Sequence, residues 1–239
     1  MWGPIPETTV DDLVRRVASL GIGGGSRILD LGCGPAELLR RIVDRTGASG
    51  IGVDSSPFAL EEARARIARS SVGDRIELRL ADVHQIEPAR EHDLVLCIGP
   101  GWDAGGWSTL AHWAAGFVAP GGHVVLGEAA WRRRPTTGEL RTLGMDAEAY
   151  PISERVEGFV ARSGVQVLWS GRARSDDWEA YGERYRTAML DFVRSAPDDP
   201  LAAAARERSG TDWPTFELLH SILDFVLIFG RPGRPTAGQ

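Results

Sequence analysis

The chain has 239 residues, 43% of them hydrophobic, and its 33 acidic and 27 basic residues give a formal net charge of -6 at pH 7. This length supports one sizeable α/β domain over residues 1–239 rather than two independent domains. The acidic balance gives no reason to expect a nucleic-acid partner held by phosphate neutralisation. The sequence contains no lysine, which excludes lysine Schiff-base chemistry, P-loop NTPases and pyridoxal phosphate enzymes.

The two cysteines, Cys33 and Cys97, form no CxxC pair and are accompanied by no histidine cluster. We therefore expect reduced thiols and no metal site. No signal peptide is visible at the start of the chain, and the apolar stretch at 222–229 is far too short to span a bilayer. These features predict a cytoplasmic protein without a membrane partner.

Strand and helix patterns alternate from residue 27 to about residue 130, as in a parallel sheet with crossover helices. The expected fold is α/β: a Rossmann-like, mostly parallel, twisted sheet of about seven strands, with helices on both faces and a helical insertion before the last strand. Strands are predicted at 27–31, 50–54, 76–80, 93–98, 123–128, 165–171 and 222–230, and helices at 8–20, 36–45, 58–70 and 152–163. The insertion, at 175–220, is expected to form a helical cap within the single domain.

The segment 27–36 is the most informative, because an apolar strand runs there into a glycine turn, Gly32-Cys33-Gly34, that carries the carboxylate of Asp30. Glycines allow a sharp turn and a close approach to a ligand at the N-terminus of the next helix. A carboxylate at this place would repel the phosphates of a dinucleotide. It would attract a cationic cofactor that has no phosphate, such as S-adenosylmethionine.

Asp54 closes the second predicted strand, 20 residues after Gly34. In an open α/β sheet, a carboxylate at this position binds the hydroxyl pair of a ribose, which both NAD and S-adenosylmethionine contain. The dinucleotide fingerprint GxGxxG would require glycine at position 37, which is Glu37 here. Asp30 and Glu37 both argue against NAD.

Four segments in order, Asp30 to Gly34, Asp54, Ala81 to Val83 and Pro120 to Gly122, resemble the signature of class I S-adenosylmethionine-dependent methyltransferases over roughly residues 25–130. The insertion is similar to that of bacterial small-molecule methyltransferases with a helical cap. The resemblance implies that the glycine turn approaches the methionine part of the cofactor, whose product is S-adenosylhomocysteine. It also implies that Asp30 orients the amino end, Asp54 holds the ribose, and Asp82 with Val83 contacts the adenine. The cofactor residues are then Asp30, Gly32, Cys33, Gly34, Asp54, Ser55, Asp82, Val83, Cys97, Ile98 and Gly99.

The acceptor half of the site is less specific in the sequence. The loop after the fourth strand lacks the Asn or Asp, Pro-Pro and aromatic motif of methyltransferases that act on the exocyclic amines of bases or on glutamine. Aromatic and arginine side chains expected at the same sheet edge are candidates for substrate contact: Trp102, Trp131, Arg134, Trp178 and Tyr181. Arginines 132–134 are either solvated or bind an anionic substrate group. The aromatic residues of the insertion form either a lid or a docking face.

We therefore expect methyl transfer from S-adenosylmethionine to an O, N, S or C atom of a small-molecule acceptor by in-line displacement. A base is needed only where the acceptor must lose a proton, and Glu128 and His112 are the candidates. Two alternatives remain open: an NAD-dependent oxidoreductase with a degenerate fingerprint, and a catalytically silent cofactor-binding protein. A monomer and a homodimer are both compatible with the sequence.

Overall fold

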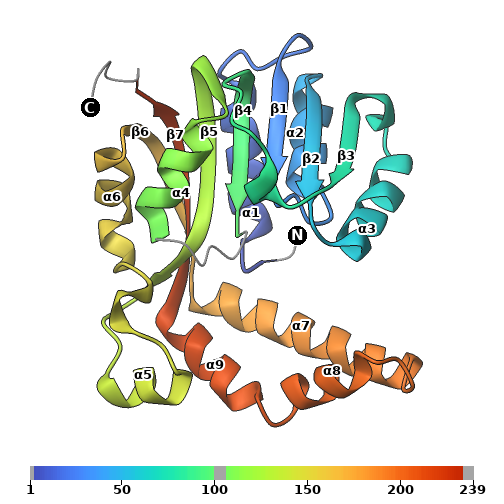
Figure 1. Cartoon of the computed structure of the whole chain (residues 1–239), viewed down its shortest axis with the longest axis vertical. Coiled ribbons are helices and arrows are strands. Elements are labelled where there is room, and N and C mark those ends of the chain that lie inside the picture. The colour runs from blue at the N-terminus through green and yellow to red at the C-terminus, as the bar shows by residue number, and fades with distance from the viewer. Residues whose placement is uncertain (1–2, 100–105, 234–239) are drawn as a thin grey trace.

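The sheet is built around β1 (Arg27–Leu31), which pairs in parallel with β2 (Ser49–Asp54) on one side and β4 (His92–Ile98) on the other. The computed structural model describes residues 3–99 and 106–233. Within them, a seven-stranded sheet has the order β3-β2-β1-β4-β5-β7-β6 (Figure 1). β7 runs antiparallel to β5 and β6, and the other neighbouring strands are parallel. The predicted fold class is confirmed. The remaining strands are β3 (Ile76–Leu80), β5 (Val118–Trp131), β6 (Val165–Ala173) and β7 (Leu223–Pro232).

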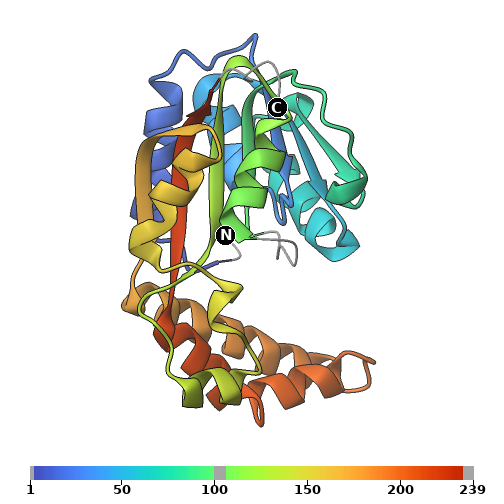
Figure 2. The same ribbon diagram turned by 60° about the vertical axis from the view of Figure 1, so that its left-hand side comes forward.

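Helices cover both faces of this sheet (Figure 2). Apolar residues of three helices share a buried cluster with Ile28 on one face, and those of two others share a cluster with Leu29 on the opposite face. The first three are α1 (Glu7–Ala18), α2 (Glu37–Thr46) and α3 (Pro57–Ala68); the other two are α4 (Gly106–Ala115) and α6 (Val156–Arg162).

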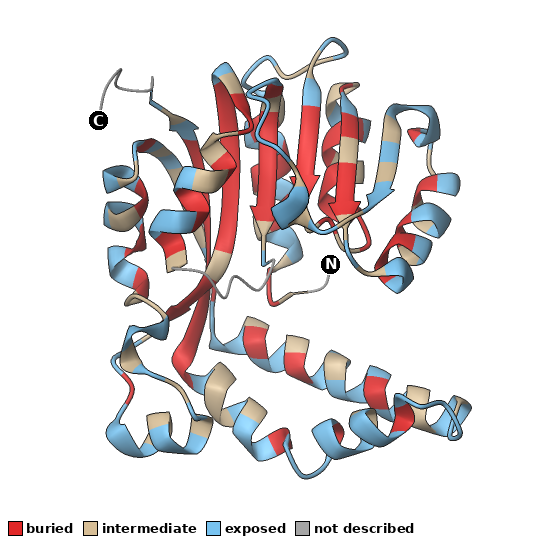
Figure 3. Ribbon diagram, viewed as in Figure 1, coloured by how far each residue is buried: buried red, intermediate tan, exposed pale blue. Residues whose placement is uncertain are grey.

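Alternation along the central strands decides which layer each side chain faces. Ile28 packs with the cluster of α1, α2 and α3, whereas Leu29 and Leu31 pack with that of α4 and α6. Because successive side chains of a strand point to opposite faces, Asp30 lies on the α2 side. By the same rule Cys97 of β4 lies on the α4 side, and it is found in that cluster. The central strands are buried along most of their length (Figure 3).

Two of the predicted elements begin more than one residue away from their expected start. β5 begins at Val118 rather than at residue 123, because the Pro120 to Gly122 segment interrupts its pairing without ending the strand: Val118 pairs with His92, and His123 pairs with Leu94. Gly121 has φ +87°, which glycine adopts readily. The helix predicted at 152–163 begins with a 3-10 turn, Ser153–Arg155, before α6.

Three helices, α7 (Ser175–Ser195), α8 (Ala202–Ser209) and α9 (Trp213–Ile222), fill the chain between β6 and β7. They lie beyond the carboxyl ends of β1, β2 and β4 (Figures 1 and 2), and we refer to α7, α8 and α9 together as the cap. A short helix, α5 (Thr137–Leu143), contacts α9. The helical insertion before the last strand is thus present. In the part of the chain that the structure describes, no helix has both the length and the apolar character needed to cross a membrane.

Candidate functional site

The glycine turn after β1 is held by the end of β2. The backbone N–H groups of Gly32 and Cys33 both donate to the carbonyl oxygen of Val53, each at 2.9 Å. Gly32 and Gly34 have φ of +74° and +53°, and Ala36 has φ +52°. Left-handed backbone at Gly32 and Gly34 suits residues without a Cβ, whereas Ala36 adopts it at a cost. The turn is therefore held in place by hydrogen bonds from its own backbone.

Asp54 ties this turn to the next helix. Its Oδ2 accepts a hydrogen bond from the Gly34 N–H at 2.7 Å, and its Oδ1 accepts one from the Ser56 N–H at 2.8 Å. Ser56 in turn caps α3, because its hydroxyl accepts from the Ala59 N–H. The carboxylate thus lies at the carboxyl end of β2, directly beside the glycine turn.

Asp30 is buried on β1, with only 6% of its surface exposed. Burial, together with the nearby negative charge of Asp54, raises the pKa of Asp30 to about 7. Two carboxylates thus lie close together at the glycine turn, and the charge of at least one is uncompensated there. Such a pair favours a ligand that brings positive charge.

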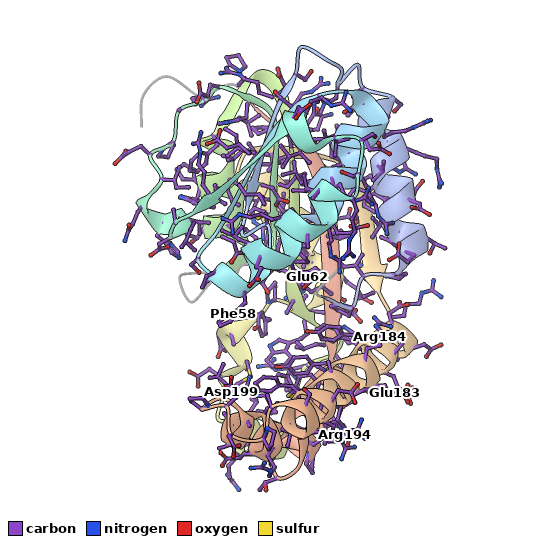
Figure 4. All side chains as sticks on the ribbon, turned by 90° about the vertical axis from the view of Figure 1, so that its right-hand side faces the viewer. Phe58, Glu62, Glu183, Arg184, Arg194 and Asp199 are labelled. Atoms are coloured by element: carbon purple, nitrogen blue, oxygen red, sulfur yellow. The ribbon has the colours of Figure 1, made fainter. Side chains whose placement is uncertain are left out.

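A cavity of about 540 Å³ opens at this turn and extends to the cap. One wall comes from the ends of β1, β2, β4 and β5, and includes Asp30, Asp54 and Glu128. The opposite wall is aromatic and comes from α7 and α9. Figure 4 shows the sheet with its helices and the cap from the side, with Phe58 on α3 and Arg184 on α7. The cap side is lined by Trp178, Tyr181, Tyr185, Phe216, Leu219 and His220.

The comparisons with known proteins agree with this geometry. A family model described as a methyltransferase domain matches residues 28–122. A trans-aconitate 2-methyltransferase from Methylobacterium radiotolerans is 32% identical over 210 residues, which cover 81% of this chain and 78% of that protein. The chain belongs to the S-adenosylmethionine-dependent methyltransferases.

Two further comparisons extend over most of this methyltransferase. The uncharacterized protein YjhP of Escherichia coli K12 is 28% identical over 184 residues, covering 76% of this chain and 74% of YjhP. The crystal structure of an S-adenosylmethionine-dependent methyltransferase from Geobacter sulfurreducens, in complex with S-adenosylhomocysteine, has a TM-score of 0.85 and 25% identity. That similarity covers 97% of this chain and 93% of the other. The methyl donor of this methyltransferase is S-adenosylmethionine, and the comparisons do not support the NAD alternative.

The donor set of the turn fits this cofactor. S-Adenosylmethionine carries an ammonium and a sulfonium group and no phosphate, which suits the paired carboxylates of Asp30 and Asp54. Glu37, the acid at the third glycine position, is compensated separately. Burial alone would raise the pKa of Glu37, but hydrogen bonds from Arg40 and Arg41 outweigh it and lower the pKa to about 2.

The structure brings most of the predicted site residues to this one cavity. The following line it: Asp30, Gly32, Cys33, Gly34, Asp54, Ile98, Gly99, Glu128, Trp178 and Tyr181. Ser55 and Asp82 are exposed, Val83 is half-buried, and Cys97 faces α4; none of these four lines the cavity. Asp82 uses its carboxylate to accept a hydrogen bond from the His84 N–H. Trp102 lies outside the described residues.

Three other candidates are not at the cavity. Trp131 is buried in the core instead, where its Nε1–H donates to the Ala147 carbonyl at 2.9 Å and its ring meets Tyr150 edge-on. Trp131 does lie at the end of β5, at the expected edge of the sheet, but the segment around Ala147 covers it. Arg134 is exposed to solvent, and His112 is exposed on α4.

Arg132 turns inward, as considered for one arginine of the 132–134 run, but its partners belong to the protein. Its guanidinium donates to Asp224 Oδ1 at 2.9 Å, to the hydroxyl of Ser175 and to the carbonyl oxygens of Ser221 and Leu223. It therefore joins β5 to both ends of the cap, and no substrate anion is needed to explain its position.

Several residues that line the cavity were not predicted from the sequence. Phe216, Leu219 and His220 of α9 complete the aromatic wall, and Tyr150 lines the cavity from a loop. The spacing of Phe216, Leu219 and His220 places them on one helical face, and this pattern could have indicated them. No local signal marks Tyr150, whose position depends on tertiary packing.

Proposed function

We propose that this methyltransferase acts on a small-molecule acceptor, at an O, N, S or C atom, bound between the glycine turn and the cap. The observation that supports this most directly is the single cavity lined by both the cofactor residues and the aromatic wall of α7 and α9. A cavity of about 540 Å³ between the strand ends and the helices of the cap suits a compact ligand better than a macromolecule. The cap, residues 175–220, would then belong to one domain with the sheet and cover the acceptor.

S-Adenosylmethionine supplies a methyl group bound to its sulfonium sulfur. The acceptor atom attacks the methyl carbon in line with the carbon–sulfur bond, which breaks to release S-adenosylhomocysteine. The protein's contribution is to align the two reactants and to exclude water. Asp30 would hold the amino end of the methionine part and Asp54 the ribose, with Asp82 and Val83 beside the adenine at the end of β3. The rest of the cofactor side would be formed by backbone groups at the ends of β2 and β4. These belong to Ser55, Cys97, Ile98 and Gly99.

Glu128 is the better placed of the two candidate bases. It lies near the carboxyl end of β5 and lines the cavity, whereas His112 is exposed on α4. Its Oε1 accepts a hydrogen bond from the Ala129 N–H at 2.7 Å. Where the acceptor loses a proton, we assign its transfer to Glu128.

The test uses methyl-labelled S-adenosylmethionine, the purified protein and an extract of its source organism. We expect label in compounds of low mass and none in protein or nucleic-acid fractions. The matched control is Asp54→Ala, which should weaken S-adenosylhomocysteine binding by roughly 1.5 to 3 kcal/mol because a charged hydrogen bond to the ribose is lost. Label confined to macromolecules would contradict the proposal. Cofactor binding without any transfer would favour the catalytically silent alternative.

A further inference from the structure

The aromatic rings of the cap pack on one another and form a continuous wall. Tyr181 and Tyr185 of α7 are stacked with ring centroids 6.0 Å apart, and Tyr185 stacks on Phe216 of α9 at 5.5 Å. Trp178 lies against His220 at 4.4 Å. Rings fixed by their neighbours lose little conformational entropy when a ligand packs on them, and they favour a flat aromatic ligand.

The charges around the cavity disfavour an anionic acceptor. Its charged lining residues within the described chain are the acids Asp30, Glu37, Asp54 and Glu128, and none of the described lining residues is an arginine. Residues 1–2 and 100–105, which adjoin the lining residues Gly3 and Gly99 in sequence, contain no basic residue. A carboxylate on the acceptor would lose its hydration and meet no cationic side chain among the described lining residues.

A second cavity of about 470 Å³ lies against the same aromatic side chains, Trp178, Phe216 and His220. Its lining includes three more acids, Glu179, Glu183 and Glu217, together with Arg132. Because Arg132 is already bound to Asp224 and to the ends of the cap, it is not available to an incoming anion. An acidic compound is therefore disfavoured from this side as well.

A cationic acceptor is disfavoured for a different reason. The reacting atom must lie in line with the positively charged sulfonium, so a second positive charge beside it would be repelled. An uncharged acceptor avoids both penalties, and it needs only a neutral polar partner in the wall.

His220 is that partner. Within the described residues its imidazole has ring contacts with Trp178, Tyr181 and Phe216 but no hydrogen bond. Burial lowers the pKa of His220 to about 4, so the ring is neutral at pH 7. A neutral imidazole offers one acceptor and one donor nitrogen.

We propose that the acceptor half of the cavity binds an uncharged aromatic compound that carries a hydroxyl group, with its ring against Trp178 and Tyr181 and its hydroxyl hydrogen-bonded to His220. This rests on the proposed function, since it names the class of its acceptor. The proposed acceptor is uncharged, and it therefore differs from trans-aconitate, the compound in the name of the Methylobacterium radiotolerans relative.

Binding of probe compounds to the full chain saturated with S-adenosylhomocysteine tests the proposal, measured by equilibrium dialysis at about pH 7. The probes share one ring system: 2-naphthol, naphthalene without the hydroxyl, and anionic 2-naphthoate. We expect 2-naphthol to bind roughly fivefold tighter than naphthalene through one hydrogen bond. It should bind at least about tenfold tighter than anionic 2-naphthoate, because the carboxylate would be desolvated among acidic side chains without a counter-ion.

The variant His220→Phe keeps an aromatic ring in the wall and removes both nitrogens. It should reduce the affinity for 2-naphthol to that for naphthalene and leave naphthalene binding unchanged, a difference that a purely structural role would not produce. The proposal is overturned by equal losses for both probes, by 2-naphthoate binding as tightly as 2-naphthol, or by absence of 2-naphthol binding. The wild-type ranking needs no variant. Loss of S-adenosylhomocysteine binding or of label transfer would instead contradict the proposed function.

Discussion

At the scale of single residues, Asp30 and Asp54 set the chemistry of the glycine turn. Asp54 is satisfied by two backbone N–H groups, from Gly34 and Ser56, whereas Asp30 is buried beside it and has a raised pKa. The free protein therefore stores unfavourable electrostatic energy at Asp30 when this group is ionised. A cofactor ammonium can release that energy, which couples cofactor binding to the ionisation of Asp30.

We predict that S-adenosylhomocysteine binds more weakly as the pH falls below about 7. Because the pKa of Asp30 is raised to about 7, the free protein must lose a proton to bind in this range. The α-amino group of the ligand stays protonated there. Calorimetric titration should give an affinity about fivefold lower at about pH 6 than at about pH 7. Asp30→Asn should bind more weakly at both pH values and without this slope. A slope that persists in the variant would assign the proton to another group.

The same carboxyl group should limit the stability of the cofactor-free protein. Since its folded-state pKa is raised from 3.8 to about 7, the folded state holds this proton more tightly than the unfolded chain. The free energy of unfolding therefore falls as the pH rises from about 4 to about 7. Urea denaturation should show that the free energy of unfolding of wild type falls by about 2 to 3 kcal/mol relative to that of Asp30→Asn between about pH 5 and pH 8. Parallel pH profiles for the two proteins would show that the carboxyl is not destabilising.

At the scale of elements, Arg132 fastens the cap to the sheet. It follows β5, and its hydrogen bonds reach Ser175 at the start of α7 and the carbonyl oxygens at the junction of α9 and β7. Its ion pair with Asp224 is largely buried, with side chains 27% and 11% exposed. Removing the arginine would leave a buried carboxylate without its cation.

Arg132→Ala should therefore lower the free energy of unfolding by about 2 to 3 kcal/mol. The neighbouring Arg134→Ala is the matched control, because Arg134 is exposed, and it should change stability by less than about 0.5 kcal/mol. Urea denaturation of both variants measures the difference. Equal, small effects would mean that the cap is held without Arg132.

The sequence predicted the elements that depend on local pattern. The seven strands follow from apolar runs in the sequence. The start of β5 was misplaced because Pro120 to Gly122 resembles a turn, yet the sheet pairing continues across it. α5 was missed although Thr136 and Glu139 form a capping box, a signal that was present in the sequence.

The cofactor half of the cavity was easier to predict than the acceptor half for the same reason. The glycine turn and Asp54 lie at strand ends, which a parallel sheet brings to one edge. Trp178 and Tyr181 reach the cavity as expected from the helical face they share, but Trp131 does not, because a loop distant in sequence covers it. Whether a tryptophan at a strand end faces a ligand or the core depends on such long-range packing.

At the scale of the whole molecule, the sheet and the cap differ in how they are stabilised. The central strands β1, β4 and β5 are buried between helices on both faces (Figure 3). In α8 only Ala202 and Ser209 are buried. Few buried apolar contacts mean low local stability, so α8 should open without unfolding of the sheet.

Native-state hydrogen exchange should resolve this difference. In the free protein, amides of α8 should exchange through local opening, well before those of β4 and β5, which should exchange only through global unfolding. S-Adenosylhomocysteine alone should slow exchange at the glycine turn, residues 32–37, and leave α8 unchanged. An acceptor bound against Trp178 and Tyr181 should additionally slow exchange in α7, because an ordered ligand would then bridge the sheet and the cap. Exchange of α8 and the central strands as one cooperative unit would contradict separate opening of α8.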